Sequence, residues 1–487
     1  LFFGPSLSYK VLHFFAYLLG SFSLWSFLKN KRISVFGWFC ANLVYYFSFF
    51  LINHQIHFNL IMSAYLFPVA FFLVDRFSST RNKKFLILFS LLFVYIMYWG
   101  YYQIVAIMLI GSYLLLLFSM QGINKIKVVF KFVLLSLAFI IAASLPNILS
   151  TLDLAQHSVR DDAFQFAEGT YNPPLFVNTL LPFIFGKFQN YFGRVAIGSV
   201  YSYTETYTYF GVTAVVFACL SLFLLEKNRL VYFSYSLVIF FIVIASIGVF
   251  PFAKYLPVIN IFRHWERSAL LGVMGVAILV SYFVTNCEKV DFKKIFQKKT
   301  LWLILVPLLY LAVLFLFTRN SYINKITINH VIPKGNYHKV WLALLIFSVL
   351  LPLKSKIFIF TKFVGTLPYL ICLLILIDLR YYGEDVLNAR VKYIENPVPI
   401  TSNIGFEKIR VIDAKSKIIG MQFLNSNSYT IFGYSQLINK SYFNSLKKYG
   451  FDGRIVAPEG ELYLSEELSG LFGVEAIITD TGILSSD

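Results

Sequence analysis

The chain has 487 residues, 58% of them hydrophobic and 14% charged, and its formal net charge is +18. A soluble domain carries about 25% charged residues, so this composition excludes an ordinary soluble globular protein. The positive charge does not indicate a nucleic-acid partner, because the basic residues lie at the ends of apolar segments and not on one water-facing surface.

Residues 1–380 are predicted to form an all-α polytopic membrane domain of about twelve spans, since a hydrocarbon core of about 30 Å needs roughly 20 apolar residues per helix. In chain order the predicted spans are 8–28, 33–53, 58–76, two short helices within 85–120 that meet at a tight turn, 132–150, 208–225, 230–249, 268–286, 300–318, 340–353 and 357–378. Pro146 lies near the end of the sixth span, where a kink or a helix end is expected.

The links between the predicted spans alternate in charge. Lys and Arg concentrate in the short links at 29–32, 76–84, 125–131, 227–229, 289–299 and 354–356, whereas the links at 54–57 and 100–103 carry none. The positive-inside rule predicts that the basic links face the cytoplasm. The long links 151–206, 250–267 and 319–339 and the chain after 379 would then face outside, as in a multi-pass protein of a cell membrane.

Segment 381–487 is predicted to be a small extracytoplasmic α/β domain, because its apolar runs shorten to strand length, as at Ile409–Ile412 and Glu475–Thr479. At the other end of the chain, a span follows Leu1 almost at once and no signal-peptide pattern is present. An outside N-terminus of this kind leads us to expect that an earlier span and the outer loop after it are missing.

Acidic residues are rare in the first third of the chain, where Asp75 is the only one before Asp153. The run 152–162 has amphipathic spacing, and in a helix His157, Arg160 and Asp161 would share one face. A carboxylate beside Arg and His can act as a base whose protonation its neighbours tune. The alternative is a solvated interfacial helix with ordinary ion pairs.

Two further outer segments suggest a binding site. Residues 172–186 are apolar but too short to span, which predicts a re-entrant segment that roofs a cavity or, equally, a lipid-facing anchor. Arg263 and Arg267 lie four residues apart where an outer loop re-enters the membrane, and two guanidinium groups can clamp phosphate oxygens. The alternative for them is headgroup anchoring together with Trp265.

The uncharged links also carry polar groups. Tyr101 and Gln103 lie at the outer ends of two short helices, where they could line a site or be satisfied by neighbouring helices. His54 and His57 are more typical of interfacial residues than of metal ligands, and no metal site is predicted.

The chain resembles the bacterial YfhO-like family of polytopic membrane proteins, which is similar to the GT-C class of lipid-sugar-dependent glycosyltransferases. The matching segments are spread over nearly the whole chain: Gly100–Gln103, Pro146 followed by Asp153 and Ser158–Arg160, Glu205–Gly211, Phe262–Arg263 with Arg267, Gly433–Tyr434 ahead of Tyr442, and Leu471–Ile478.

The resemblance implies an enzyme that moves a sugar from a polyprenyl-phosphate carrier to a cell-envelope polymer outside the cytoplasm. It implies that Arg160, Arg263 and Arg267 hold the carrier phosphate, with His264, Tyr101 and Gln103 as further substrate-binding residues. The acidic base of GT-C enzymes usually lies in the first outer loop, which we expect to be missing from this sequence. Asp161, Asp162 and Glu205 are therefore the candidate catalytic residues, and the cofactor stays open, with a divalent metal among the options.

Two other functions compete with glycosyl transfer. A lipid or solute transporter or flippase would carry ionisable groups near the middle of its spans, often with internal repeats, and the sequence has no repeat and almost no such charge. A non-catalytic protein of envelope assembly is the other alternative, since a fold alone does not establish an activity.

Overall fold

The computed structural model describes residues 5–98, 101–156, 176, 178–180, 208–246, 264–287, 343–346, 348, 366–395, 410–413, 429–430, 476–479 and 482–485. The chain divides into two compact units, one made of Leu1–Ser144 and Phe166–Asn388, the other of Leu145–Gln165 and Ala389–Asp487. The predicted span 300–318 lies outside the described residues, as does most of 340–353.

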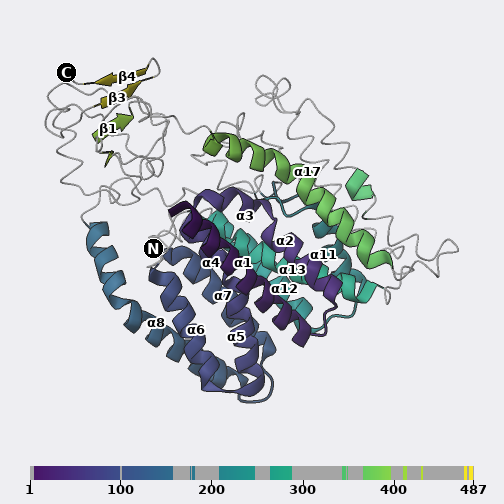
Figure 1. Cartoon of the computed structure of the whole chain (residues 1–487). Coiled ribbons are helices and arrows are strands. Elements are labelled where there is room, and N and C mark those ends of the chain that lie inside the picture. Colours follow the sequence, from purple (N-terminus) through teal and green to yellow (C-terminus); the bar gives the residue numbers. More distant parts are fainter. Residues whose placement is uncertain are drawn as a thin grey trace, which may run out of the picture. The chain divides into compact units, whose positions relative to one another are not determined.

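The described part of the first unit is helical (Figure 1). Its α-helices and their bounds are α1 (Pro5–Asn30), α2 (Val35–Tyr46), α3 (Phe49–Asn53), α4 (Phe58–Tyr65), α5 (Phe67–Thr80), α6 (Lys83–Tyr98), α7 (Tyr102–Ser119), α8 (Lys125–Gln156), α11 (Val212–Leu224), α12 (Arg229–Ala245), α13 (Ala269–Asn286) and α17 (Leu367–Glu395). Short 3-10 helices occur at η1 (His54–Ile56) and η8 (Trp265–Ser268). Helices α8 and α17 continue into the second unit.

The structure confirms some predicted spans and corrects others. The prediction of two helices within 85–120 is confirmed, since α6 ends at Tyr98 and α7 begins at Tyr102. The predicted span over 58–76 is confirmed, since Phe58–Thr80 is long and apolar enough to cross a membrane, although it is divided into α4 and α5 near Pro68. The prediction of one span over 33–53 is wrong, because α2 ends before Phe47. Of the two alternatives expected near Pro146, a kink or a helix end, the helix end is absent, since α8 continues to Gln156 with Pro146 inside it.

Five described helical segments are long and apolar enough to cross a membrane: Lys10–Asn30, Phe58–Thr80, Tyr102–Ser119, Lys125–Asp153 and Trp265–Asn286. Three shorter apolar helices accompany them, at Val35–Tyr46, Val212–Leu222 and Arg229–Ala245. Apolar helices of this length in one bundle indicate a membrane protein.

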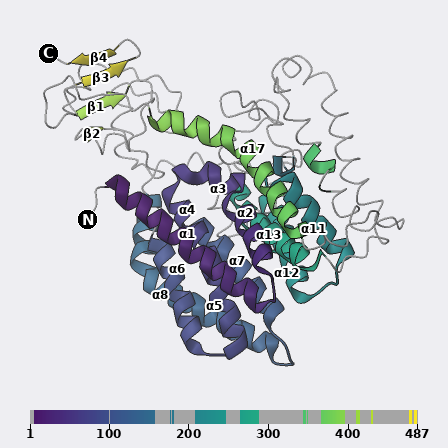
Figure 2. The same cartoon turned by 45° about the vertical axis from the view of Figure 1, so that its right-hand side comes forward.

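Helix α13 forms the core of the bundle and packs against α2, α11 and α12 (Figures 1 and 2). It is apolar on all sides, and 15 of its 18 residues are buried. Small residues bring its neighbours close: a Cβ added at Gly275 would lie 2.6 Å from the carbonyl oxygen of Ser234 in α12. Glycine contacts of this kind are typical of helices packed within a membrane.

Several of the basic links meet at one end of this bundle. After α1, Asn30 donates a hydrogen bond to the carboxylate of Asp75 in α5 at 3.0 Å, and Nζ of Lys31 lies 2.5 Å from the second oxygen of that carboxylate. After α5, Arg81 donates through Nη1 to Sδ of Met120 at the end of α7, at 2.6 Å. The links that follow α1, α5 and α7 are therefore neighbours in space.

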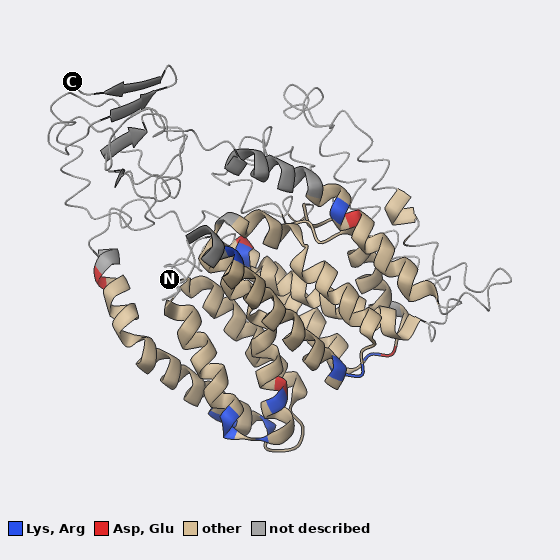
Figure 3. Cartoon of the chain, in the orientation of Figure 1, with Lys and Arg blue, Asp and Glu red and all other residues tan. Residues whose placement is uncertain are grey.

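The C-terminal end of α13 lies beside the same links. Oγ1 of Thr285 accepts a hydrogen bond from the backbone N–H of Ser34 at 3.0 Å, and the Tyr282 hydroxyl donates to the backbone oxygen of Glu226 at 2.9 Å. We call this the basic end of the bundle, formed by the described links 29–34, 75–84, 120–131 and 226–229. Figure 3 shows blue segments gathered along the lower side of the bundle.

The opposite end is built where α11 and α13 begin and where α3 lies. The backbone N–H of Phe49 donates to the oxygen of Tyr209 at 3.1 Å, and both rings join a buried cluster with Ile52, Val212 and Tyr382. On the other side, the Ser268 hydroxyl contacts the oxygen of Phe241 in the last turns of α12. The candidate functional residues lie at this end.

The described residues after α17 form four short strands, β1 (Arg410–Asp413), β2 (Tyr429–Thr430), β3 (Ala476–Thr479) and β4 (Gly482–Ser485). They make one sheet in the order β2-β1-β3-β4, in which β1 is parallel to both neighbours and β3 and β4 are antiparallel. The strand-length runs noted at 409–412 and 475–479 coincide with β1 and β3. The α/β domain over 381–487 stays a prediction.

Candidate functional site

A polar cluster lies at the opposite end of the bundle, where the turn between α6 and α7 meets η8. We define it as Tyr101, Gln103, His264, Glu266 and Arg267. The amide of Gln103 joins the two segments, because its Nε2 donates to the backbone oxygen of His264 at 3.0 Å and its Oε1 accepts from Nη1 of Arg267 at 3.3 Å. One side chain thus holds segment 264–267 against the start of α7.

Arg267 is the arginine of the cluster, and it is buried, with 7% of its surface exposed. Its guanidinium carbon lies 5.1 Å from the centroid of the Tyr101 ring, which is a cation–π contact. Such a contact stabilises by about 2 kcal/mol when it is shielded from water. Arg267 is therefore fixed in position by an aromatic face on one side and the Gln103 amide on the other.

His264 turns the chain into η8. Its backbone has φ 62° and ψ 54°, which is the left-handed region that side chains other than glycine seldom adopt. This conformation costs about 1–2 kcal/mol, and it aims the His264 carbonyl oxygen at both Gln103 and the backbone N–H of Arg267, 3.1 Å away. Strain of this kind is common at functional sites.

Glu266 is completely buried, and its Oε1 lies 2.9 Å from Nδ1 of His264. The two side chains thus share one hydrogen bond. A buried carboxylate is costly unless it is paired. The cluster thus combines a cation, a carboxylate and an imidazole within one short stretch of chain.

The structure brings together all the predicted substrate-binding residues that it describes. One set of contacts joins two links that are about 160 residues apart, and it includes Tyr101, Gln103, His264 and Arg267. The remaining site predictions lie outside the described residues: Arg160, Arg263, Asp161, Asp162 and Glu205. Their roles stay predictions.

Glu266 was not among the predicted site residues. The sequence nevertheless pointed to it, because Glu266 lies between Trp265 and Arg267, directly before a long apolar helix. An acidic residue at such a place is costly to bury and usually has a function.

A second buried acid, Asp378 in α17, was also missed. Its Oδ1 accepts a hydrogen bond from the hydroxyl of Tyr209 at 2.6 Å, and its Oδ2 accepts one from the backbone N–H of Thr213 at 2.9 Å. The carboxylate thus caps the first turn of α11, where N–H groups have no partner within the helix. The signal for it was a lone acid at the end of the apolar run 367–377.

Gly211, in the segment 205–211 that carries part of the resemblance, allows this cap. It precedes α11 with φ 92°, and an added Cβ would lie 3.3 Å from Oδ2 of Asp378. Only glycine adopts such a backbone without strain, so the approach of α17 to α11 depends on this residue.

The described residues of the predicted re-entrant segment 172–186 also lie at the opposite end. The ring of Phe176 packs on Phe241 of α12 with centroids 5.6 Å apart, and the oxygen of Thr179 accepts from the backbone N–H of Phe210 at 3.2 Å. This part of the segment contacts the chain near α11 and α12; whether it roofs a cavity stays a prediction.

Within the described ranges, no group of three or more His, Cys, Asp and Glu side chains lies close enough to hold a metal ion. Comparison of the chain with protein-family models, curated proteins and solved structures gave no match.

Proposed function

We propose that this chain is an integral membrane glycosyltransferase of the GT-C type, related to the YfhO-like proteins. It would move a sugar from a polyprenyl-phosphate carrier to a cell-envelope acceptor outside the bacterial cell membrane. The observation that carries the proposal is Arg267, a nearly buried cation held by Tyr101 and Gln103 at the end of the bundle opposite the basic links.

The chemistry requires a fixed cation in a site with little water. In the reaction, the acceptor oxygen bonds to the anomeric carbon while the bond from that carbon to the phosphate oxygen breaks, so negative charge collects on the carrier phosphate. Guanidinium donors that are already oriented stabilise this charge strongly. Arg267 supplies such a donor, and Arg160 and Arg263 are proposed to act with it.

The acceptor hydroxyl must lose its proton to a base. Asp161, Asp162 and Glu205 remain the proposed bases, since each lies in the long outer link. Glu266 and His264 belong to the phosphate side of the proposed site, where the carboxylate orients the imidazole.

The proposed topology places the basic end in the cytoplasm and the polar cluster outside, following the positive-inside rule. The twelve-span count and an extracytoplasmic α/β domain over 381–487 belong to the same proposal. An outer location suits the acceptor, because envelope polymers are assembled on that side.

The test is transfer of radiolabelled sugar from a polyprenyl-phosphate donor in membranes that contain the full chain. Arg267→Lys keeps the charge but loses the fork of the guanidinium, and it is expected to lower the transfer rate roughly 100-fold. The matched control is Arg380→Lys, which changes an exposed arginine of α17 in the same way.

Failure of the folded chain to transfer any sugar, with carrier still crossing the membrane, would favour the flippase alternative. Absence of both activities would favour a role in envelope assembly. Equal rates for the wild type and Arg267→Lys would remove Arg267 from the site.

A further inference from the structure

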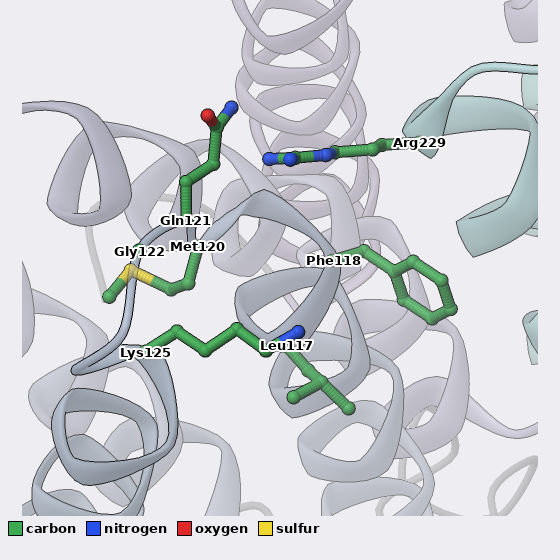
Figure 4. A pocket seen from close by; sticks show the side chains of 7 residues that line it. All are labelled: Leu117, Phe118, Met120, Gln121, Gly122, Lys125 and Arg229. Atoms are coloured by element: carbon green, nitrogen blue, oxygen red, sulfur yellow. The ribbon is translucent and has the colours of Figure 1, made fainter.

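An open pocket of about 290 Å³ lies at the basic end, away from the polar cluster. It is lined by Leu117, Phe118, Met120, Gln121, Lys125 and Arg229. The side chains come from the end of α7, the start of α8 and the start of α12, so three helices contribute to one cavity. Figure 4 shows the guanidinium of Arg229 directed towards the amide of Gln121, while the side chain of Lys125 ends beside Leu117.

The charged side chains that line the pocket are all positive. Lys125 and Arg229 line it, and a third cation, Arg81, donates to Sδ of Met120 in its wall. None of the described residues that line it is acidic. The guanidinium of Arg229 and the ammonium of Lys125 can both donate hydrogen bonds to the oxygens of a phosphate group, and the Gln121 amide offers a further polar contact.

The walls of the pocket are held in place by packing. The ring of Phe118 in α7 lies 6.3 Å from that of Phe233, which is one turn after Arg229 in α12. Gly122 reverses the chain between α7 and α8 with φ 88°, and no atom would lie within 4 Å of a Cβ added to it. The turn therefore leaves the space beside Lys125 open.

The surroundings of the pocket favour a lipid over a soluble ion. One candidate membrane span ends at Ser119 and the next begins at Lys125, so the pocket lies at the level where lipid headgroups are expected. Beside it, Ile123 is 102% exposed, and Ile126 and Phe130 are largely exposed as well. Apolar side chains that flank cations in this way can contact acyl chains while the cations bind the headgroup.

We propose that this pocket binds the phosphate headgroup of an anionic phospholipid in the leaflet at the basic end. Lys125 and Arg229 bind the phosphate oxygens, Gln121 binds a polar group of the headgroup, and Leu117 with Ile123 contacts the chains. The site is independent of the polar cluster and of the activity proposed for it.

The test is a titration of the purified full chain in mild detergent, with bound lipids counted by native mass spectrometry. The probes are phosphatidylglycerol, phosphatidylcholine with the same acyl chains, and inorganic phosphate. The pocket variant is Lys125→Gln with Arg229→Gln, and the matched control is Lys83→Gln with Lys84→Gln, which removes the same charge from exposed residues outside the pocket.

The proposal predicts that phosphatidylglycerol binds more tightly than phosphatidylcholine, and that the pocket variant weakens this binding roughly tenfold to thirtyfold at low salt while the control changes it less than twofold. Equal losses in both variants, or equal binding of the two lipids, would overturn it. Displacement of the lipid by millimolar inorganic phosphate would overturn the choice of a lipid ligand.

Discussion

The two ends of the helix bundle use their charged side chains differently. At the basic end, the described cations Lys83, Lys84, Lys125 and Arg229 are exposed. At the opposite end, Glu266 and Asp378 have no exposed surface and Arg267 has 7%. The opposite end also carries the exposed Lys10 and Arg380, and the basic end carries the buried Asp75. Among the described residues, however, Arg267 at the opposite end is the Lys or Arg side chain that is buried.

This difference indicates how charged residues that anchor a membrane protein can be distinguished from charged residues that act in its function. Exposed cations at helix ends are solvated, so they orient the protein and meet lipid headgroups at little cost. A buried charge loses its hydration, which is costly without specific partners. Function is therefore expected at the opposite end, and orientation and lipid contact at the basic end.

The largest expected effect is at Asp378. The substitution Asp378→Leu leaves the Tyr209 hydroxyl and the Thr213 N–H without their acceptor, at about 1–3 kcal/mol for each buried group. We expect a loss of about 4 kcal/mol in the free energy of unfolding, measured in detergent against Asp378→Asn, which keeps an acceptor oxygen. Equal melting temperatures for Asp378→Leu and the wild type would show that the cap does not hold α17 to α11.

The second-largest loss of stability is expected for Arg267→Met. It removes the contact with the Tyr101 ring and the hydrogen bond to Gln103, which together contribute about 3 kcal/mol. The measurement is thermal unfolding of Arg267→Met compared with that of Arg380→Met. Arg380 is an exposed arginine at the same end, so the pair compares the loss of a buried cation with the loss of an exposed one. A larger loss in Arg380→Met would reverse the contrast between buried and exposed cations.

Much of this contrast could be predicted from the sequence, although not the contacts that make it. The charge of each link is visible in the sequence, and Tyr101, Gln103, His264 and Arg267 could each be selected as polar groups at uncharged or outer links. Their meeting could not be predicted, because the pairs are 161 and 164 residues apart and only tertiary packing joins them.

The helix breaks were less predictable for a related reason. Segments 33–53 and 58–76 are largely apolar, so hydropathy gives little sign that α2 and α4 end within them. The break before α3 is accompanied by the hydrogen bond between Phe49 and Tyr209, a contact across about 160 residues. Pro68 was a local sign of the other break, since proline favours the first turn of a helix.

A smaller effect is expected at Gly211. In Gly211→Ala the backbone would keep φ near 92° only with strain, and the new methyl group would press on Asp378. We expect a loss of about 1–2 kcal/mol in the free energy of unfolding. Gly122→Ala is the control, since its φ is also positive but the space around it is open. A loss confined to Gly122→Ala would argue against the contact with Asp378.

The smallest effect is expected at the exposed cations. Lys83→Gln with Lys84→Gln should change the free energy of unfolding by less than about 0.5 kcal/mol, because both side chains are exposed. Thermal unfolding in the detergent used for the other variants measures it. A loss comparable to that of Arg267→Met would mean that the basic end contributes to stability as the opposite end does.

The most direct test of the account is which compartment each end of the bundle faces. Single cysteines at Lys84 and at Arg380, in a variant whose four native cysteines are replaced by alanine, mark the basic end and the opposite end. A membrane-impermeant maleimide should label Arg380→Cys in intact cells and Lys84→Cys only after the cells are opened. Labelling of both positions from one side, or in the reverse order, would contradict the account.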